Sequence, residues 1–249
     1  MPDMRTPPMN NAISKSLPVL LLPFALLFAG AVHASGLQPY TATYDVARNG
    51  DAIGNATVTL QRTPDGWSYD SQTHGTHGMA ALAAADVSEH SDVRDARGTL
   101  ETQRYRYRLS TLLKSRERSI DVDAGAGRIV GVDKGREQDF PMQPGVLDRQ
   151  SVMLAIAQDL ASGKRGTLTY DIADSKHVEA QRYQVGKEEI VRVPAGAIRT
   201  IVVTRLRDGD SGRTTVSWLG LDNGFVPVRI VQTEPNGDVE EMRLVSLRR

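Results

Sequence analysis

One stretch of the sequence has the periodicity of a long helix, and it stands in the middle of a chain that otherwise has the pattern of β-strands. It runs from Asp148 to Ser162. Its apolar side chains cover an arc of roughly 200° at 100° per residue, more than a helix needs when it rests on a flat surface. Asp148 is a suitable N-cap, and Gly163 is a stop signal. We therefore predict one helix, at about residues 148–162, that is cradled by its surroundings.

The segments on both sides of this helix alternate apolar and polar residues, which is typical of half-buried strands. Asn49-Gly50 is a hairpin turn signal between two such runs. The Ala-rich segment 78–85 fits either a short helical turn or a loop. We expect strands within residues 40–46, 56–60, 67–71, 87–93, 103–109, 119–122, 128–132, 167–172, 179–186, 188–193, 198–206, 214–219, 226–233 and 238–247.

This pattern predicts a mainly β fold, in which a curled antiparallel sheet or half-barrel surrounds one central α-helix. A curled sheet around one helix has a concave side. The pattern does not decide whether side chains or a ligand fill that side, because small barrels are often packed solid.

The first 34 residues have the features of a secretory signal peptide. Arg5 and Lys15 supply positive charge, residues 17–29 form the apolar run, and Val32-His33-Ala34 supplies small residues for cleavage after Ala34. A membrane anchor is the competing interpretation, but the run is shorter than the roughly 20 residues that a spanning helix needs. We expect a periplasmic protein that does not span the membrane after cleavage, with residues 35–249 forming a single β-rich domain.

Composition excludes some functions. Without its first 34 residues the chain has 28 basic and 29 acidic residues, a net charge of −1, which argues against nucleic-acid binding. The sequence has no cysteine, so it forms no disulfide, offers no thiol chemistry and has no site for a lipoprotein anchor.

Motifs for catalysis or metal binding are weak. His74 and His77 are three residues apart, with His90 downstream, and could share a metal only if both pointed inward. The alternative is a pair of solvated imidazoles, since no third ligand motif follows. No G-x-S-x-G, S-x-x-K or phosphate-loop pattern occurs. We expect no metal, no cofactor and no enzymatic activity.

A basic ribbon is the strongest electrostatic feature. Arg104, Arg106 and Arg108 alternate along one predicted strand and therefore share one face of it. Such a face could contact anionic lipid head groups, an acidic polymer or a protein partner. The simpler alternative is a solvated face whose arginines pair with acids on neighbouring strands.

Candidate residues for an apolar ligand are those of the helix arc together with one tryptophan. Each is also an ordinary core residue, which is the more common role for such side chains. The candidates are Val152, Met153, Ile156, Leu160 and Trp218.

A series of features spread over nearly all of the sequence after residue 34 carries a resemblance to a known family. They are, in order, Tyr40, Tyr44, Gly54, 78–82, 104–108, the predicted mid-chain helix, Trp218 and 225–230. In this order they resemble an exported bacterial family known as domain of unknown function 3108. The final part, Trp218 and 225–230, is also similar to the ending of lipoprotein-carrier-like half-barrels of the bacterial periplasm.

The family resemblance implies a Gram-negative periplasmic protein of unassigned activity. The second likeness implies, by analogy, a curved sheet that holds an acyl chain against a helix, and neither supplies catalytic residues. Together with the pattern they favour a non-enzymatic periplasmic binding module for an apolar or amphipathic, lipid-like envelope molecule. The alternative is an envelope structural or assembly factor that contacts an envelope protein, and a hydrolase is a third hypothesis.

Overall fold

A computed structural model describes residues 36–207, 209 and 212–249. The chain divides into two units, Met1–Ala34 and Ser35–Arg249, and all described residues lie in the second. The expected signal peptide and its cleavage after Ala34 fall outside the described residues.

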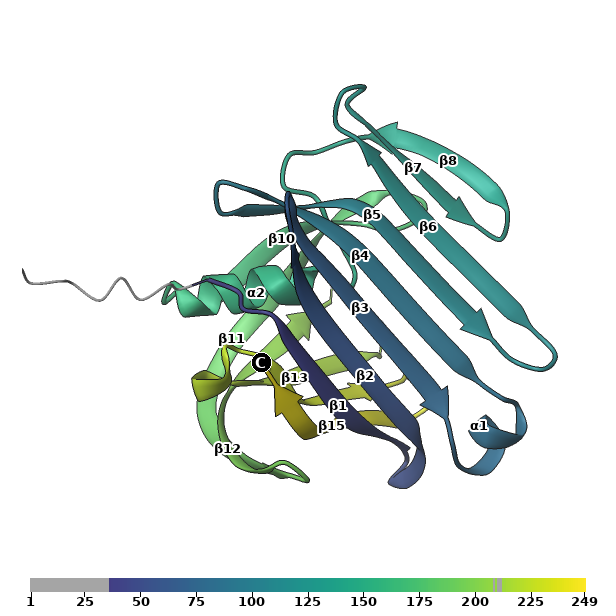
Figure 1. Cartoon of the computed structure of the whole chain (residues 1–249), viewed down its shortest axis with the longest axis vertical. Helices are drawn as coiled ribbons and strands as arrows, with labels where there is room; N and C mark the ends of the chain where they lie inside the picture. Colours follow the sequence, from purple (N-terminus) through teal and green to yellow (C-terminus); the bar gives the residue numbers. More distant parts are fainter. Residues whose placement is uncertain (1–35, 208, 210–211) are drawn as a thin grey trace, which may run out of the picture. The chain divides into compact units, whose positions relative to one another are not determined.

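Fifteen strands of the described chain form one sheet, which confirms the mainly β class (Figure 1). The strand order across the sheet is β8-β7-β6-β5-β4-β3-β2-β1-β15-β14-β13-β12-β11-β10-β9. Every neighbouring pair is antiparallel except β9 and β10, which are parallel. The strands are β1 (Tyr40–Arg48), β2 (Asp51–Thr63), β3 (Gly66–Gly75), β4 (Asp86–Ala96), β5 (Thr99–Ser110), β6 (Ser115–Asp123), β7 (Arg128–Asp133), β8 (Arg136–Pro141), β9 (Leu147–Asp148), β10 (Thr167–Ala173), β11 (Val178–Val193), β12 (Gly196–Leu206), β13 (Thr214–Gly220), β14 (Pro227–Thr233) and β15 (Val239–Arg248).

Tight hairpins join many of these strands in sequence order. The turns Asn49-Gly50, Arg97-Gly98 and Lys134-Gly135 each contain two residues, and all six have positive φ, between 52° and 89°. A two-residue turn of this kind matches the natural twist of an antiparallel pair, and glycine adopts it without strain. These local signals explain why strands that follow one another in the sequence are mostly neighbours in the sheet. The order departs from the sequence where the first and last strands, β1 and β15, pair, which leaves β8 and β9 at the two edges.

The sheet curls until its two ends meet, although β8 and β9 do not pair within the described residues. Gly131 on β7 lies against the backbone of Ser175, in the turn after β10. The Thr102 amide on β5 donates a 2.9 Å hydrogen bond to the carbonyl oxygen of Val146, just before β9. A small core of Tyr105, Ile120, Ile129, Val146 and Ala173 fills the junction. The result is a barrel-like but non-closed sheet with an inner face, which carries the core, and an outer face.

The helix predicted at 148–162 is present but shorter. Helix α2 is the ten-residue segment Val152–Ala161, and six of its residues are buried. The prediction of Asp148 as its N-cap was wrong, because residues 147–148 pair with β10 as strand β9 and Ser151 holds the N-cap position. The described chain also contains the short helix α1 (Gly78–Leu82) and the 3-10 turn η1 (Leu221–Asn223).

The prediction of a central helix is not supported either. One helix of ten residues cannot organise a sheet of fifteen strands, and each strand is held by its sheet neighbours. Helix α2 instead contributes to the main core beside residues from both halves of the sheet, such as Leu60, Tyr69, Ile172 and Leu219. The breadth of its apolar arc reflects burial on several sides.

Asp148 fixes the chain where it enters α2. Its fully buried carboxylate accepts hydrogen bonds from Ser91 Oγ at 3.0 Å, Thr102 Oγ1 at 2.7 Å, and the amides of Gln150 and Ser151 at 2.7 and 2.9 Å. Four donors compensate the charge that burial would otherwise penalise. The network thus connects β4, β5 and β9 to the start of the helix.

No helix in the described part of the chain is both long and apolar enough to cross a bilayer.

Candidate functional site

A cavity of about 430 Å³ lies between α2 and the inner face of the sheet. Most of its lining is of two kinds, one apolar and one basic, and the carboxylates of Asp174 and Glu179 also line it. The apolar residues are Val152, Met153, Ile156, Ile172 and Val203, and the basic residues are Arg118, Arg149, Arg205, Arg207 and Arg213. We refer to this space as the inner cleft.

The apolar wall follows from the periodicity of α2 and its neighbours. Val152 and Ile156 are one turn apart and are almost fully buried, while Met153 is half-buried beside them. Ile172 on β10 and Val203 on β12 lie on the inner face and continue this surface. A ligand chain placed here would contact only hydrocarbon side chains on that side.

The basic wall arises at the end of strand β12, where the inward face continues beyond the core. Ile201 and Val203 are buried in the core, Arg205 follows on the same face, and Arg207 comes two residues later, just after the strand. Arg213 enters the cleft from the start of β13. Consecutive positions on one strand face therefore change from aliphatic to cationic, which makes the cleft amphipathic.

Four of the five cleft arginines form ion pairs with acidic side chains. Arg205 contacts Glu179 at 3.2 Å and Arg213 contacts Glu234 at 2.6 Å. Arg118 contacts Asp133 at 3.4 Å and Arg149 contacts Glu89 at 3.5 Å. Arg118 and Arg149 also lie near the ring of Tyr107, at 5.8 and 5.5 Å from its centroid.

Arg207 is different, since no carboxylate among the described residues pairs with it. Burial and then the charges of Arg205 and Arg213 lower its pKa, against the weaker influence of Tyr183 and Glu179. The guanidinium nevertheless remains cationic at physiological pH. The inner cleft therefore contains one cation without a carboxylate partner in the described chain.

Tyr183 supplies a neutral polar group on the same wall. Burial raises the pKa of Tyr183, although the charges of Arg205 and Arg207 oppose this effect. Its hydroxyl is therefore protonated near neutral pH and donates a 2.9 Å hydrogen bond to Gln181 Oε1. Because this proton is already donated, the Tyr183 oxygen is left as a hydrogen-bond acceptor at the cleft.

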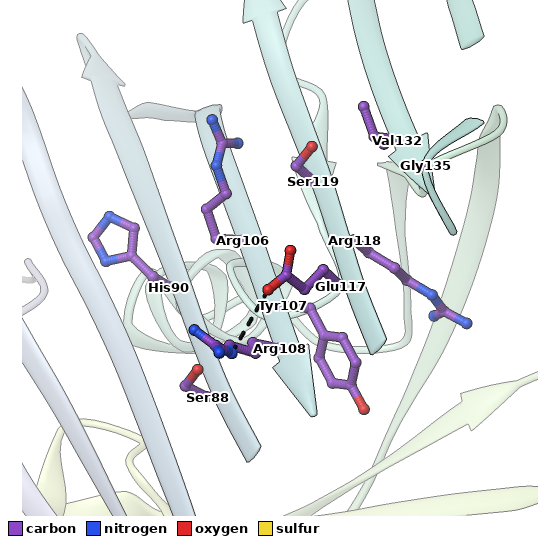
Figure 2. Close-up of a pocket in the computed structure, with 10 residues that line it drawn as sticks. All are labelled: Ser88, His90, Arg106, Tyr107, Arg108, Glu117, Arg118, Ser119, Val132 and Gly135. Atoms are coloured by element: carbon purple, nitrogen blue, oxygen red, sulfur yellow. Dashed lines mark ion pairs between the residues drawn. The ribbon is translucent and has the colours of Figure 1, made fainter. Parts of the chain in front are cut away.

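A second hollow, of about 500 Å³, lies on the outer face over β4, β5 and β6 (Figure 2). Arg106 and Arg108 line it, together with His90, but Arg104 does not. Figure 2 shows the ion pair between Arg108 and Glu117, whose atoms are 3.6 Å apart. We refer to this hollow as the outer groove.

The three arginines of the basic ribbon share the outer face, as their spacing predicts, and each has an acidic neighbour. Arg106 contacts Asp121 at 2.7 Å and also donates to the carbonyl oxygens of Tyr105 and Ile120. Arg104 lies 3.4 Å from Asp92 and 3.6 Å from Asp121. These ion pairs partly neutralise the positive charge of the three arginines.

The structure brings together only part of the predicted apolar site. Val152, Met153 and Ile156 line the inner cleft, whereas Leu160 is buried in the main core and is not part of its lining. Trp218 does not join them, because it alternates with the cleft residue Ser217 and so points to the outer face. There its indole donates a 2.6 Å hydrogen bond to Glu189 and lies under Arg229.

The histidines that the sequence singles out are also placed on the surface. His74 pairs with Asp86, and His77 contacts Thr76 Oγ1 at 2.8 Å. Within the described residues, no three side chains of histidine, aspartate or glutamate form a group that could hold a metal ion.

Sequence reasoning missed Arg205, Arg207 and Arg213. A signal for Arg205 was present, because it continues the alternation of Ile201 and Val203 within the predicted strand 198–206, and Arg207 continues the same period one residue past its end. The sequence pattern at 104–108, with three arginines in alternation, predicted a basic surface on the outer face instead. Arg213 gave no comparable signal, since it comes after a loop that interrupts the period.

Together, the fold and the cleft define a class of barrel-like β protein with an amphipathic inner cleft. The chain belongs to the family described as protein of unknown function DUF3108, whose model matches residues 39–245. No curated protein matches the chain.

Several solved structures are similar to this chain at low sequence identity. A β-barrel-like DUF1849 protein from Brucella abortus is 13% identical, with a TM-score of 0.55, covering 85% of this chain and 98% of that one. MucB is 12% identical with a TM-score of 0.33, over 86% of this chain and 54% of MucB. An outer membrane lipoprotein-sorting protein domain from Vibrio parahaemolyticus is 10% identical with a TM-score of 0.23, over 87% of this chain and 86% of that one. Of these three likenesses, only the first reaches a score that indicates a common fold.

Proposed function

We propose that this protein is a non-enzymatic binding module of the bacterial cell envelope, and that it holds an amphipathic, lipid-like molecule in the inner cleft. The observation that carries this proposal is the cleft itself: about 430 Å³ with hydrocarbon side chains on one wall and arginines on the other. Ligand sites commonly have volumes of about 300–1,000 Å³, mostly apolar walls and a few oriented polar groups.

The energetic basis is the burial of an apolar chain against α2. Each methylene group transferred from water to an apolar surface contributes about 0.8 kcal/mol, so a chain of several carbons would bind measurably. Met153 suits this role because its flexible side chain adapts to irregular ligands and it is only half-buried without one. The signal-peptide pattern of the first 34 residues supports an envelope location.

Native mass spectrometry tests the proposal. The full chain would be expressed with its leader, purified from the periplasm without detergent, and weighed before and after organic extraction. We expect additional mass that is removed by the extraction and identified as an amphipathic compound. A protein that carries only its own mass from the periplasm would contradict the proposal.

A matched pair of variants locates the bound molecule. Met153→Glu places a charge on the apolar wall at a half-buried position, so it should abolish the additional mass while leaving the protein folded. Met79→Glu introduces the same change on α1, where the side chain is 78% exposed, and should leave the additional mass in place. Equal effects of the two substitutions would place the molecule elsewhere.

A second candidate function is the docking of an envelope protein on the outer face. The outer groove favours it, because Arg106 and Arg108 border a hollow of about 500 Å³. Reversing the charge of Arg104, Arg106 and Arg108 together should abolish capture of that partner in the periplasm and leave any mass bound in the inner cleft unchanged. Partner capture that survives the triple charge reversal would argue against this second function.

A further inference from the structure

The basic end of the inner cleft contains buried polar atoms without partners. The Nε atoms of Arg205 and Arg207 and the hydroxyl oxygen of Thr215 are all shielded from solvent and make no hydrogen bond in the structure. All three residues line the cleft: Arg205 lies on β12, Arg207 just after it, and Thr215 on the neighbouring strand β13. Native proteins rarely leave buried polar groups unpaired. Four further atoms of this kind belong to described residues outside the cleft, so the distinctive feature of this wall is that three of them gather around one cavity of ligand size.

The charge at this end selects an anion. Arg207 has no carboxylate partner among the described residues, and the nearby charges of Arg205 and Arg213 repel it. Glu179 and Glu234 already neutralise those two arginines, so the remaining positive charge belongs to Arg207. An anion bound at this position would remove the repulsion and accept hydrogen bonds from the guanidinium group of Arg207.

We infer that Arg205, Arg207 and Thr215 bind the phosphate-type head group of the molecule in the inner cleft. A phosphate monoester offers three acceptor oxygens and a charge of about −1.5 to −2, whereas a carboxylate offers two oxygens and a single charge. The group of Arg205, Arg207 and Arg213 around one uncompensated charge matches the larger charge of the former. The inference rests on the proposed function, because it names the head group of the ligand whose chain contacts α2. The shared chemistry could come from a lipid whose head group ends in a phosphate monoester or from free inorganic phosphate.

Isothermal titration calorimetry with three probes separates these sources. The probes are dodecyl phosphate, the uncharged dodecyl maltoside, both below their critical micelle concentrations, and inorganic phosphate, all at one fixed low ionic strength. The variants are Arg207→Gln, Thr215→Val and the control Arg108→Gln, which removes an arginine of the outer groove instead. Thr215→Val removes an unpaired hydroxyl, so it provides a second variant should Arg207→Gln fail to fold.

We expect the wild type to bind dodecyl phosphate at least about tenfold more tightly than dodecyl maltoside, since hydrogen bonds to charged groups are worth about 1.5–3 kcal/mol. Arg207→Gln should remove this preference, Thr215→Val should reduce it severalfold, and Arg108→Gln should retain it. Binding of dodecyl phosphate well above that of inorganic phosphate would assign the site to a lipid head group.

The failures of the two proposals are distinguishable. If inorganic phosphate binds with sensitivity to Arg207→Gln and neither amphiphile binds more tightly, the anion site stands with free phosphate as its ligand and the lipid-binding function falls. If both amphiphiles bind equally and Arg207→Gln has no effect, the phosphate site is overturned and the lipid-binding function remains. If no probe binds, both are overturned.

Discussion

A methyl group on Gly131 would lie 2.5 Å from the carbonyl oxygen of Ser175, so β7 and the turn after β10 are in direct backbone contact. These segments lie near opposite ends of the sheet, whose two edge strands are β8 and β9. The absence of a side chain at residue 131 is therefore what allows the sheet ends to meet.

Replacing Gly131 by alanine should destabilise the protein by about 1–3 kcal/mol, because one of the two backbones must move. Chemical denaturation measures the loss in the free energy of unfolding. Gly125→Ala is the matched control: this exposed turn position has only Asp123 Oδ1 nearby, at 3.5 Å, and should change stability by less than about 0.5 kcal/mol. Equal midpoints for the two variants would show that the ends do not meet in solution.

Asp148→Ala should cost about 3 kcal/mol or more. The substitution leaves Ser91, Thr102 and two backbone amides without their buried acceptor, and each unpaired group carries its own penalty. Thermal or denaturant unfolding measures this loss in the free energy of unfolding. Asp123→Ala removes a single acceptor in an exposed turn, where the Ala126 amide donates at 2.9 Å, and should cost only about 1 kcal/mol. A loss for Asp148→Ala no larger than this would contradict the network.

The stability contributed by His90 should depend on pH. Burial alone would lower the pKa of His90, but hydrogen bonds to Asp70 and Asp92 and their charges outweigh it, so the pKa lies above the ordinary 6.5. A raised pKa means that protonation favours the folded state. The contribution is fully present below pH 6.5 and is lost as the pH rises through the folded-state pKa.

Comparing wild type with His90→Gln across pH 5 to 9 checks this dependence. The variant should be less stable than the wild type at pH 5.5, by at most about 1 kcal/mol because the ion pair is solvated, and the difference should disappear at high pH. His77→Gln controls for the loss of an exposed imidazole, since the His77 ring contacts Thr76 and forms no ion pair with a carboxylate among the described residues. A difference that is constant with pH would indicate lost packing instead of lost charge.

Arg207→Gln should leave the unliganded protein as stable as the wild type, or more stable by up to about 0.5 kcal/mol, since it removes repulsion from Arg205 and Arg213. Arg205→Gln, the matched change on the same strand face, removes the 3.2 Å ion pair with Glu179 and should be neutral or destabilising. Melting temperatures at low and high salt provide the measurement, because salt screens the repulsion. A clear destabilisation by Arg207→Gln would show that this arginine has a stabilising contact in the unliganded fold.

Strand positions were predictable to a large extent, because their signals are local. The alternation along β1, β5 and β12 and the turn Asn49-Gly50 each depend on a few neighbouring residues. The inward face of α2 was predictable for the same reason. The first residue of α2 was not, because the Asp148 carboxylate accepts hydrogen bonds from Ser91 and Thr102, which are more than forty residues away in the sequence.

Periodicity and turn chemistry act over short distances, so the amino-acid sequence alone was enough to predict the family, the mainly β class and the residues that share a strand face. Three features followed only from the folded chain: the sheet ends meet at Gly131 and Ser175, Trp218 points to the outer face, and Arg205, Arg207 and Arg213 converge on one cleft. The physical reason is that curvature and long-range contacts set which faces become concave. No local pattern encodes which of two polar strand faces will be enclosed.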